Sequence, residues 1–281
     1  MPLKNERPNQ MNELPKASLI ISVYKNVRDL KVVLDALAFQ TEKRFEIIIS
    51  EDGNSLEMKT FVENYQTEFK LTHLSQADIG WRKNQALNNA IRASSSPYLI
   101  FIDGDSVLHH RFIENHLRFA SPKDILAGRR IKFGVKYSNK LRAMPLLKFE
   151  KSIFGNLYAL LSDGVKFIEE GIYINPDGPF RFIANKRTVS WITGCNFSCY
   201  KDALVSINGF DEDYIKPAIG EDVDLTWRWI GLGYQIKSVR NYAVQYHLYH
   251  IENWTSQDEN IAIMEEKKAR NAFRCENGLE K

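Results

Sequence analysis

The run Pro97-Tyr98-Leu99-Ile100-Phe101-Ile102-Asp103-Gly104-Asp105 is the most informative part of this chain. Large apolar residues that follow one another without alternation predict a strand buried on both faces, as in a parallel sheet. Ligands of open α/β sheets bind beyond the carboxyl ends of the strands, where Asp103 and Asp105 stand. Gly104 allows the backbone to turn sharply and to approach a ligand. A divalent cation would stabilise the two carboxylates, although an isolated Asp-Gly-Asp is also compatible with a solvated turn.

The segments before this run alternate between two kinds of pattern. Apolar runs at 18–24, 45–50 and 71–74 predict buried strands. Between the first two, Leu30, Val33, Leu34 and Leu37 share one helical face, and Asn26 precedes them as a candidate cap. Residues 82–93 predict a further helix. This alternation predicts an α/β fold with a mostly parallel sheet and right-handed crossovers.

Composition limits the classes of protein to consider. The chain has 281 residues, enough for one large domain or two small ones, with 44% hydrophobic and 26% charged residues and a net charge of +3. So small a net charge argues against a nucleic-acid binder that relies on bulk charge. Neither G-x-G-x-x-G after the first strand nor a P-loop motif is present, which argues against a dehydrogenase and a P-loop protein.

The sequence also bears on compartment. The three cysteines, Cys195, Cys199 and Cys275, are odd in number and irregularly spaced, so we expect reduced thiols in a reducing compartment. The first residues lack the apolar core of a signal peptide, and no apolar run approaches the ~20 residues of a membrane span. We therefore expect a cytoplasmic protein with, at most, peripheral contact with the inner face of the membrane.

Regular patterns weaken between 128 and 190 and return afterwards. Within the weaker part, the stretch 136–160 mixes basic and apolar residues, which fits either a membrane-surface contact or an ordinary amphipathic helix packed on the domain. Beyond it, 222–231 predicts a helix with acids in its first turn, 242–246 a last strand, and 261–273 helical character in a charged tail.

Four motifs in order carry a family resemblance. They are Ser50-Glu51-Asp52-Gly53, Gly80-Trp81-Arg82, Asp103-Gly104-Asp105, and Gly209-Phe210-Asp211-Glu212 followed by Gly220-Glu221-Asp222. Together they resemble family 2 glycosyltransferases of the GT-A fold, from about 18 to 250. The C-terminal part also resembles a galactosyltransferase-type acceptor region with its trailing histidine motif.

The resemblance implies a GT-A fold, that is, a Rossmann-like and mostly parallel central sheet flanked by helices, with a C-terminal acceptor-binding subregion. We expect a flexible tail at 1–17, a nucleotide-sugar-binding half at 18–127 and an insert at 128–190 that contacts acceptor or membrane. The catalytic and acceptor-binding half then covers 191–252, and a charged C-terminal helix or tail covers 253–281.

The resemblance also implies a chemistry: inverting transfer of a sugar from a nucleoside diphosphate donor, UDP-linked by expectation, with Mn²⁺ or Mg²⁺. Asp105 is the first-choice metal ligand, and Asp103 lies nearer the ribose or reaches the metal through water. His247 and His250 are the candidates for a third ligand, and imidazole favours Mn²⁺. Asp222 matches the base that deprotonates the acceptor hydroxyl. Glu221 would orient the acceptor or assist that base.

The remaining candidate contacts fall into two groups. Those expected at the donor, around its base, ribose and diphosphate, are Ser22, Tyr24, Glu51, Asp52, Arg82, Asn88, Asp103 and Gly104. Those expected at the donor sugar or acceptor are Trp191, Gly194, Asn196, Asp211 and Glu212; for the last two, a structural turn is the alternative. The chain departs from the family's Arg-Asn pair by having Leu87-Asn88, so Arg82 or Lys83 is expected to supply the missing positive charge.

We therefore expect an enzyme that extends a glycan or a lipid-linked saccharide in surface polysaccharide synthesis, without nucleic acid as partner. A sugar nucleotidyltransferase, which releases pyrophosphate, and a non-catalytic nucleotide-sugar-binding module are the alternatives. The Gly220-Glu221-Asp222 motif with a downstream histidine argues against the first. Intact Asp105 and Asp222 argue against the second.

Overall fold

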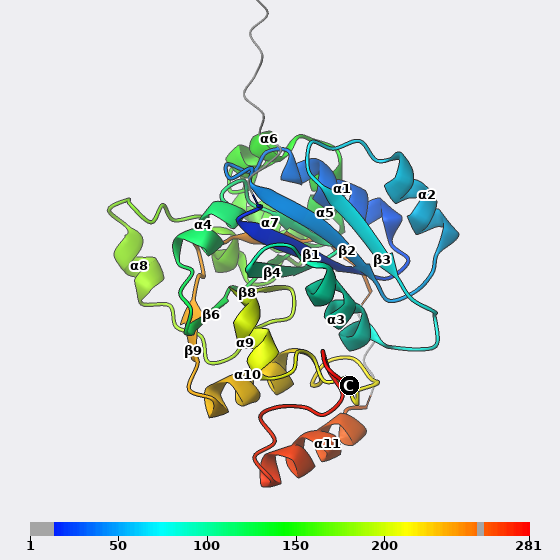
Figure 1. Cartoon of the computed structure of the whole chain (residues 1–281). Coiled ribbons are helices and arrows are strands. Elements are labelled where there is room, and N and C mark those ends of the chain that lie inside the picture. The colour runs from blue at the N-terminus through cyan, green and yellow to red at the C-terminus, as the bar shows by residue number, and fades with distance from the viewer. Residues whose placement is uncertain (1–13, 252–255) are drawn as a thin grey trace, which may run out of the picture.

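A computed structural model describes residues 14–251 and 256–281. Its centre is a sheet in the order β3-β2-β1-β4-β8-β6-β9, and a small second sheet has the order β5-β10-β7. The strands of the central sheet are β1 (Ala17–Val23), β2 (Phe45–Glu51), β3 (Leu71–Ser75), β4 (Tyr98–Asp103), β6 (Asp124–Ala127), β8 (Asn196–Tyr200) and β9 (Gln235–Ser238). Those of the small sheet are β5 (Ser106–Leu108), β7 (Ile131–Lys132) and β10 (Gln245–His247). The predicted α/β architecture is confirmed (Figure 1).

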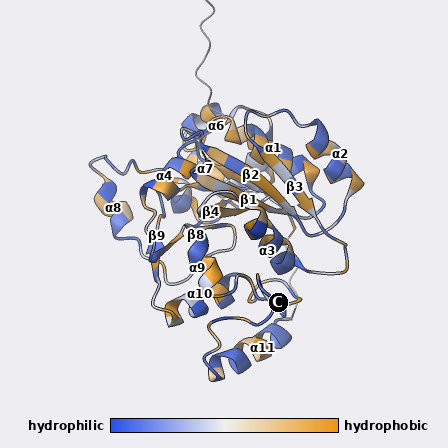
Figure 2. Ribbon diagram, in the orientation of Figure 1, coloured by the Kyte–Doolittle hydropathy of each residue, from blue (hydrophilic) through white to orange (hydrophobic). Residues whose placement is uncertain are grey.

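The four predicted strands are parallel neighbours, because β1 pairs with both β2 and β4 and β2 pairs with β3. Their side chains alternate between two buried layers, since Leu19 and Ile21 join one apolar core and Ile20 joins the other. Burial on both faces explains the unbroken apolar runs of β1, β2 and β4, whereas the edge strand β3 is only partly buried. Figure 2 shows these strands as the apolar centre of the molecule.

Helices cover both faces of the central sheet (Figure 1). One face carries α1 (Val27–Leu37) and α2 (Leu56–Asn64), and the other carries α3 (Lys83–Ala93), α9 (Lys201–Ser206) and α10 (Asp222–Gly231). The side chain of Asn26 caps α1 by accepting a hydrogen bond from the backbone N–H of Asp29 at 3.1 Å, as the sequence predicts. A further short helix, α4 (Phe112–Arg118), follows β5.

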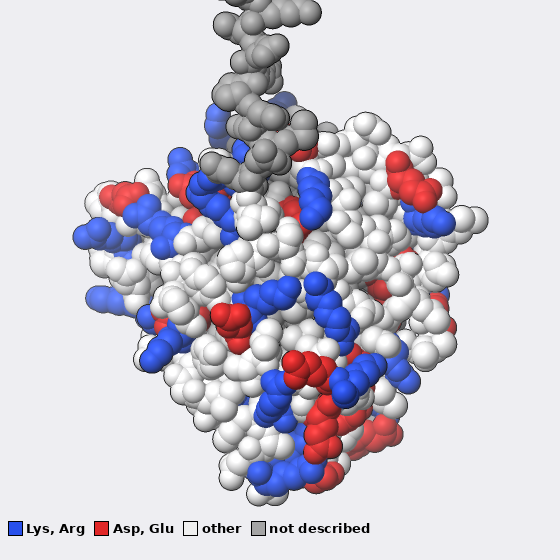
Figure 3. Space-filling model, in the orientation of Figure 1, with Lys and Arg blue, Asp and Glu red and all other residues white. Residues whose placement is uncertain are grey.

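The segment between β7 and β8 folds into short helices: α5 (Val135–Arg142), α6 (Leu146–Ser152), α7 (Leu157–Ser162), the 3₁₀ helix η2 (Ile168–Gly171) and α8 (Arg181–Asn185). Tyr137, Leu141, Phe149 and Leu160 of this segment belong to the main apolar core. Other side chains, such as Leu157 and Tyr158, remain exposed. Figure 3 shows mainly basic side chains over the edge formed by α8.

Three elements differ from the sequence-based expectation. Strand β8 runs antiparallel between β4 and β6, whereas the rest of the central sheet is parallel. The last strand, β10, covers Gln245–His247 instead of 242–246, and the C-terminal helix α11 covers Asp258–Ala269 instead of 261–273. Helix α10 has the predicted bounds.

The structure bears on the expected membrane contact, the cysteines and the two terminal tails. Across 14–251 and 256–281, no helix has the length and apolarity that crossing a membrane requires. The three cysteines are buried and free. Most of the tail expected at 1–17, namely residues 1–13, lies outside the described residues, as do residues 252–255 at the start of the expected C-terminal tail.

Candidate active site

A cavity of about 640 Å³ opens at the carboxyl ends of β1, β2 and β4, where the sequence places its motifs. It is lined by Ser22, Val23, Tyr24, Asn26, Asp52, Asp78, Gly80, Trp81, Lys83, Asp103, Gly104, Asp105 and His250. Gly104 is required by close packing, because a Cβ there would lie 2.6 Å from Val23 Cγ1. Its N–H donates to the carbonyl of Ser22 at 2.8 Å, which holds the Asp-Gly-Asp turn against the end of β1.

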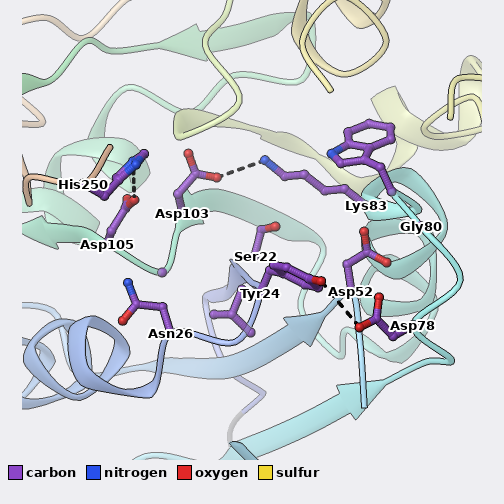
Figure 4. Close-up of a pocket in the computed structure, with 13 residues that line it drawn as sticks. Ser22, Tyr24, Asn26, Asp52, Asp78, Gly80, Lys83, Asp103, Asp105 and His250 are labelled. Carbon is purple, nitrogen blue, oxygen red and sulfur yellow. Dashed lines mark hydrogen bonds and ion pairs between the residues drawn. The ribbon is translucent and has the colours of Figure 1, made fainter. Parts of the chain in front are cut away.

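One end of the cavity is lined by Asp105 and His250, and a second imidazole, that of His247, adjoins Asp105 outside the lining. Oδ2 of Asp105 lies 3.5 Å from Nε2 of His247 and 3.2 Å from Nε2 of His250. One ligand atom from each of the three residues lies within 4.8 Å of the others. In Figure 4, Asp105 and His250 face each other across one end of the cavity. Pairing of β10 with β5 brings His247 opposite Ser106, next to Asp105.

The protonation of these groups suits a divalent cation. Burial would raise the pKa of Asp105, but the hydrogen bond with His250 and the positive charge of its neighbours outweigh burial and lower it to about 2. Burial lowers the pKa of His247 to about 4, so its imidazole is neutral at pH 7. An ionised carboxylate and a neutral imidazole are the forms that bind metal. The donor set therefore fits Mn²⁺, and fits the harder Mg²⁺ less well.

Lys83 lies at the centre of the site, between two carboxylates. Its Nζ is 3.0 Å from Oδ1 of Asp103 and 2.8 Å from Oε2 of Glu221. Burial alone would lower the pKa of Lys83, but the charges of Asp103 and Glu221 outweigh burial and raise it. Arg130 approaches Asp103 from the other side, with Nη1 3.4 Å from Oδ2. Figure 4 shows Lys83 extended toward Asp103.

Asp222 begins α10 directly after Glu221. Burial raises the pKa of the Asp222 carboxyl, and the backbone N–H groups of Val223 and Gly194 partly oppose that rise. Gly194 packs closely, since a Cβ there would lie 3.2 Å from Oε1 of Glu221. A carboxylate with a raised pKa accepts a proton more readily than an ordinary one, which is the property that a general base needs.

The opposite end of the cavity offers an aromatic face. Tyr24 is 55% exposed, and its hydroxyl lies 3.4 Å from Oδ2 of Asp78. Asp52 accepts hydrogen bonds from the backbone N–H of Arg82 at 2.7 Å and from the side chain of Gln76 at 2.9 Å. Figure 4 shows Tyr24, Asp52 and Asp78 grouped at this end.

Several predicted contact residues lie outside the cavity lining. Glu51 is buried, accepts from the N–H of Ser55 at 3.0 Å and pairs with His73 at 2.9 Å. The Arg82 guanidinium donates to the carbonyl of Trp81 at 2.9 Å. Asn88 is fully buried and fixes the loop after α9 through hydrogen bonds with both backbone groups of Phe210.

Three residues expected near the sugars also lie outside the lining of this cavity. The Asn196 amide is buried and donates to the carbonyls of Arg129 and Ala243 at 2.9 and 3.2 Å. Asp211 is buried and pairs with Lys267 of α11, and Glu212 pairs with Lys281 at 3.2 Å. These contacts hold the C-terminal segment against the domain. Trp191 is 53% exposed and lines a second cavity.

Arg130 and Asp78 are site residues that the sequence motifs did not indicate. Arg130 follows a strand of the central sheet by three residues, which is the one sequence signal that could have placed it at this edge. Asp78 lies between β3 and α3, beside Gly80-Trp81-Arg82. Its proximity to that motif was the available signal.

Comparison with known proteins identifies the family. The profile of "Glycosyl transferase family 2" matches residues 18–187. That of the "N-terminal domain of galactosyltransferase" matches residues 181–251. The chain belongs to glycosyl transferase family 2, as its motifs predict.

Individual proteins agree with this assignment. Validoxylamine A glucosyltransferase of Streptomyces hygroscopicus is 28% identical over 112 residues, which cover 39% of this chain and 26% of that protein. The chain thus spans about a quarter of that curated relative.

Two solved structures share the fold. S. aureus TarS 1-349 in complex with UDP-GlcNAc gives a TM-score of 0.60 at 14% identity, covering 93% of this chain and 67% of that chain. The mannosyltransferase PcManGT from Pyrobaculum calidifontis, in complex with GDP-Man and Mn²⁺, gives 0.57 at 12% identity, covering 93% and 64%.

Proposed function

We propose that the protein is an inverting, metal-dependent glycosyltransferase that moves a sugar from a UDP-sugar to a saccharide acceptor. The observation that carries the proposal is the arrangement at one edge of the sheet. Asp105 and His250 line one end of a 640 Å³ cavity, with His247 beside Asp105, and the exposed Tyr24 lines the other end. Diphosphate and nucleoside would occupy these two ends.

Asp105, His247 and His250 would hold Mn²⁺ or Mg²⁺ at the diphosphate. When bound, the ion supplies positive charge that stabilises the departing nucleoside diphosphate. Asp103 is paired with Lys83 and Arg130 and lines the cavity, where it would contact the ribose of the donor or a metal-bound water.

The transfer step itself rests on Asp222. Its carboxylate takes the proton from the acceptor hydroxyl, and the oxygen forms a bond to the anomeric carbon of the donor sugar. The bond from that carbon to the diphosphate oxygen breaks on the opposite face, so the configuration inverts. Glu221, paired with Lys83, orients the acceptor.

The donor is assigned to the UDP class through the nucleoside end. The Tyr24 ring offers a face for the base, and Asp52 retains carboxylate lone pairs for the uracil N–H. Ser22 and Gly104 line the space between base and diphosphate. A structurally similar protein binds UDP-GlcNAc, and another binds GDP-Man.

The acceptor side is assigned to residues 191–252 and to the insert 128–190, with 18–127 as the donor half. Trp191, Gly194 and the start of α10 lie where an acceptor would reach Asp222. We place the reaction at the cytoplasmic face of a membrane, in the assembly of a surface polysaccharide or lipid-linked glycan. Exposed apolar side chains of α7 beside the lysines of α6 support peripheral membrane contact.

Thermal unfolding with UDP, GDP, CMP and dTDP, each with and without Mn²⁺, tests the donor class. A ligand at 100 times its dissociation constant stabilises by about 2.7 kcal/mol. We expect stabilisation by UDP that requires Mn²⁺. The UDP-sugars are then screened with saccharide acceptors, and release of UDP distinguishes transfer from nucleotidyl transfer, which releases pyrophosphate. Stabilisation by none of the four nucleotides would contradict the proposal.

A further inference from the structure

A second cavity, of about 610 Å³, lies beside the candidate active site. It is lined by Arg129, Arg130, Lys132, Phe167, Glu169, Glu170, Thr188, Val189, Ser190, Trp191, Thr193 and Arg240. Four of the lining residues are basic, namely Arg129, Arg130, Lys132 and Arg240, and two are acidic, namely Glu169 and Glu170.

The acidic residues of the lining are already neutralised. Glu170 is buried and accepts from two guanidinium groups, those of Arg240 and of Arg187, the latter at 3.0 Å. Glu169 faces solvent and lies 3.7 Å from Arg187. Arg240 is engaged by Glu170 and Arg130 by Asp103, so the positive charge of Arg129 is the one we consider for attracting an anion.

Arg129 is the cation best placed to bind that anion. Its guanidinium donates to two neutral carbonyls, of Gly128 at 2.8 Å and of Trp191 at 3.1 Å. Within residues 14–251 and 256–281 it forms no ion pair with a carboxylate. The carboxylates of Glu170 and Asp222 act on its charge from beyond ion-pair distance. A partly buried arginine without a direct ion pair gains from a carboxylate or phosphate, which its fork of N–H groups can bind in bidentate fashion.

Trp191 adds a surface for a sugar ring. Its indole is half exposed, and the Arg129 guanidinium carbon lies 5.2 Å from the centre of the ring. The apolar face of a pyranose can pack on an indole while a charged substituent on the same ring reaches the guanidinium. A neutral sugar would offer Arg129 hydroxyl acceptors but no negative charge.

This cavity connects with the site of transfer through two residues. Thr193 lines the cavity and precedes Gly194, whose N–H binds the Asp222 carboxylate. Arg130 lines the cavity and pairs with Asp103 of the donor cavity. A saccharide bound here lies next to the proposed base, which is the position of an acceptor.

We propose that the second cavity selects an acceptor sugar bearing an anionic group, a carboxylate or a phosphate ester, with the anion on Arg129 and the ring on Trp191. The assignment as acceptor rests on the proposed function. The preference for an anionic sugar rests on the cavity alone, so the two can fail separately.

The test is direct binding without donor, followed by tryptophan fluorescence. The probes are methyl glucuronide, glucose 6-phosphate and methyl glucoside, titrated into the whole protein and into Trp191→Phe to assign the signal. We expect one of the two anionic sugars to bind at least about tenfold more tightly than methyl glucoside, since a charge-assisted hydrogen bond contributes that much. The preferred anionic probe distinguishes carboxylate from phosphate.

Variants locate the anion. Arg129→Gln should weaken the anionic probe about tenfold and leave methyl glucoside unchanged. Arg129→Lys should retain part of the preference. Arg181→Gln, which removes a charge from α8 outside the cavity lining, is the matched control and should change nothing. Equal binding of all three probes, or an Arg129→Gln protein that still prefers the anionic sugar, would overturn the proposal.

Binding of UDP with Mn²⁺, measured on the same proteins, keeps the two proposals apart. If UDP does not bind and the anionic preference is present, the proposed function is wrong and the anion site stands. If UDP binds and the anionic preference is absent, the anion site is wrong and the proposed function stands.

Discussion

The ammonium of Lys83 lies 2.8 Å from the carboxylate of Glu221. This ion pair connects the start of α3 to the residue that precedes α10. Lys83 also pairs with Asp103 at 3.0 Å. One buried cation thereby compensates two carboxylates. Removal of the Lys83 ammonium would take this positive charge from both Asp103 and Glu221.

We expect Lys83→Met to destabilise the fold by about 3 kcal/mol, the cost of breaking a buried ion pair by removing one partner. Burial raises the pKa of Glu221, and Lys83 opposes that rise. In the Lys83→Met variant the pKa of Glu221 should therefore be higher still. A carboxyl whose pKa is raised in the folded state loses stability as pH increases through that range. Denaturant unfolding should therefore show a larger penalty at pH 8 than at pH 4.

Lys31→Met is the matched control for this experiment. Lys31 pairs with Asp35 at 2.6 Å on the surface of α1, with both side chains at least half exposed. Such a pair contributes at most about 0.5 kcal/mol. Equal penalties for the two variants would contradict a central role for Lys83.

Strands β1, β2 and β4 can be predicted from the sequence because they are buried on both faces. Ile47, Ile48 and Ile49 all contact apolar core, on alternating sides, so the apolar run itself marks the strand. β8 gives no comparable signal of direction, because its antiparallel partners β4 and β6 are fixed by tertiary packing and not by a local turn.

Site residues at the end of a strand could also be located from the sequence, whereas residues positioned by tertiary contacts could not. Asp103, Gly104 and Asp105 are placed by the end of a strand and so could be located from sequence. Asn88 and Asn196 resemble ligand contacts in sequence, but their amides satisfy buried backbone groups. The pairing of Asp211 with Lys267 depends on where α11 docks, which no local pattern encodes.

Asp222→Asn should retain UDP binding and lower transfer by about 10²–10⁴-fold, because an amide cannot accept the acceptor proton. Single-turnover transfer and UDP-dependent thermal stabilisation are measured on the same preparation. Asp202→Asn, at an exposed carboxylate in the first turn of α9, is the control. An Asp222→Asn protein with wild-type turnover would remove the base assignment.

Asp105→Asn should abolish stabilisation by Mn²⁺, because the variant lacks the anionic ligand of the three-residue set. Isothermal titration with Mn²⁺ alone gives the affinity and the number of sites. His109, His110 and Glu150 form a second group that could hold an ion, so His110→Ala is the control. If Mn²⁺ binding is lost in His110→Ala and kept in Asp105→Asn, the ion belongs to that second group.

His116 should make the fold sensitive to acid. Burial lowers its pKa to about 3, and the neutral ring bonds to Ser198 at 2.7 Å and Asn196 at 3.1 Å. The unfolded state binds a proton below its own pKa of about 6.5, so stability is present above that pH and lost as pH falls toward 3. Each such group contributes a slope of about 1.4 kcal/mol per pH unit.

The measurement is the free energy of unfolding of wild type and His116→Gln between pH 7 and pH 4. The variant is less stable at pH 7, because two buried hydrogen bonds are disturbed, but its slope with pH should be smaller by about one proton. Parallel profiles would show that His116 is not the group that titrates.

Exposed apolar residues of α7 give the last prediction. Leu157, Tyr158 and Leu161 are 54%, 81% and 60% exposed, and Lys148 and Lys151 lie on the preceding helix α6. Deleting 136–160 would remove core residues such as Phe149 and Leu160, so loss of activity in that deletion would be uninformative.

Replacing the three exposed residues Leu157, Tyr158 and Leu161 by serine leaves this core in place. It should reduce sedimentation with anionic vesicles, since the apolar contact is lost and only charge attraction remains. Leu56→Ser, at a 78% exposed leucine of α2, is the control. Vesicle binding that is equal in the triple variant, the control and the wild type would exclude α7 as the membrane-contacting surface.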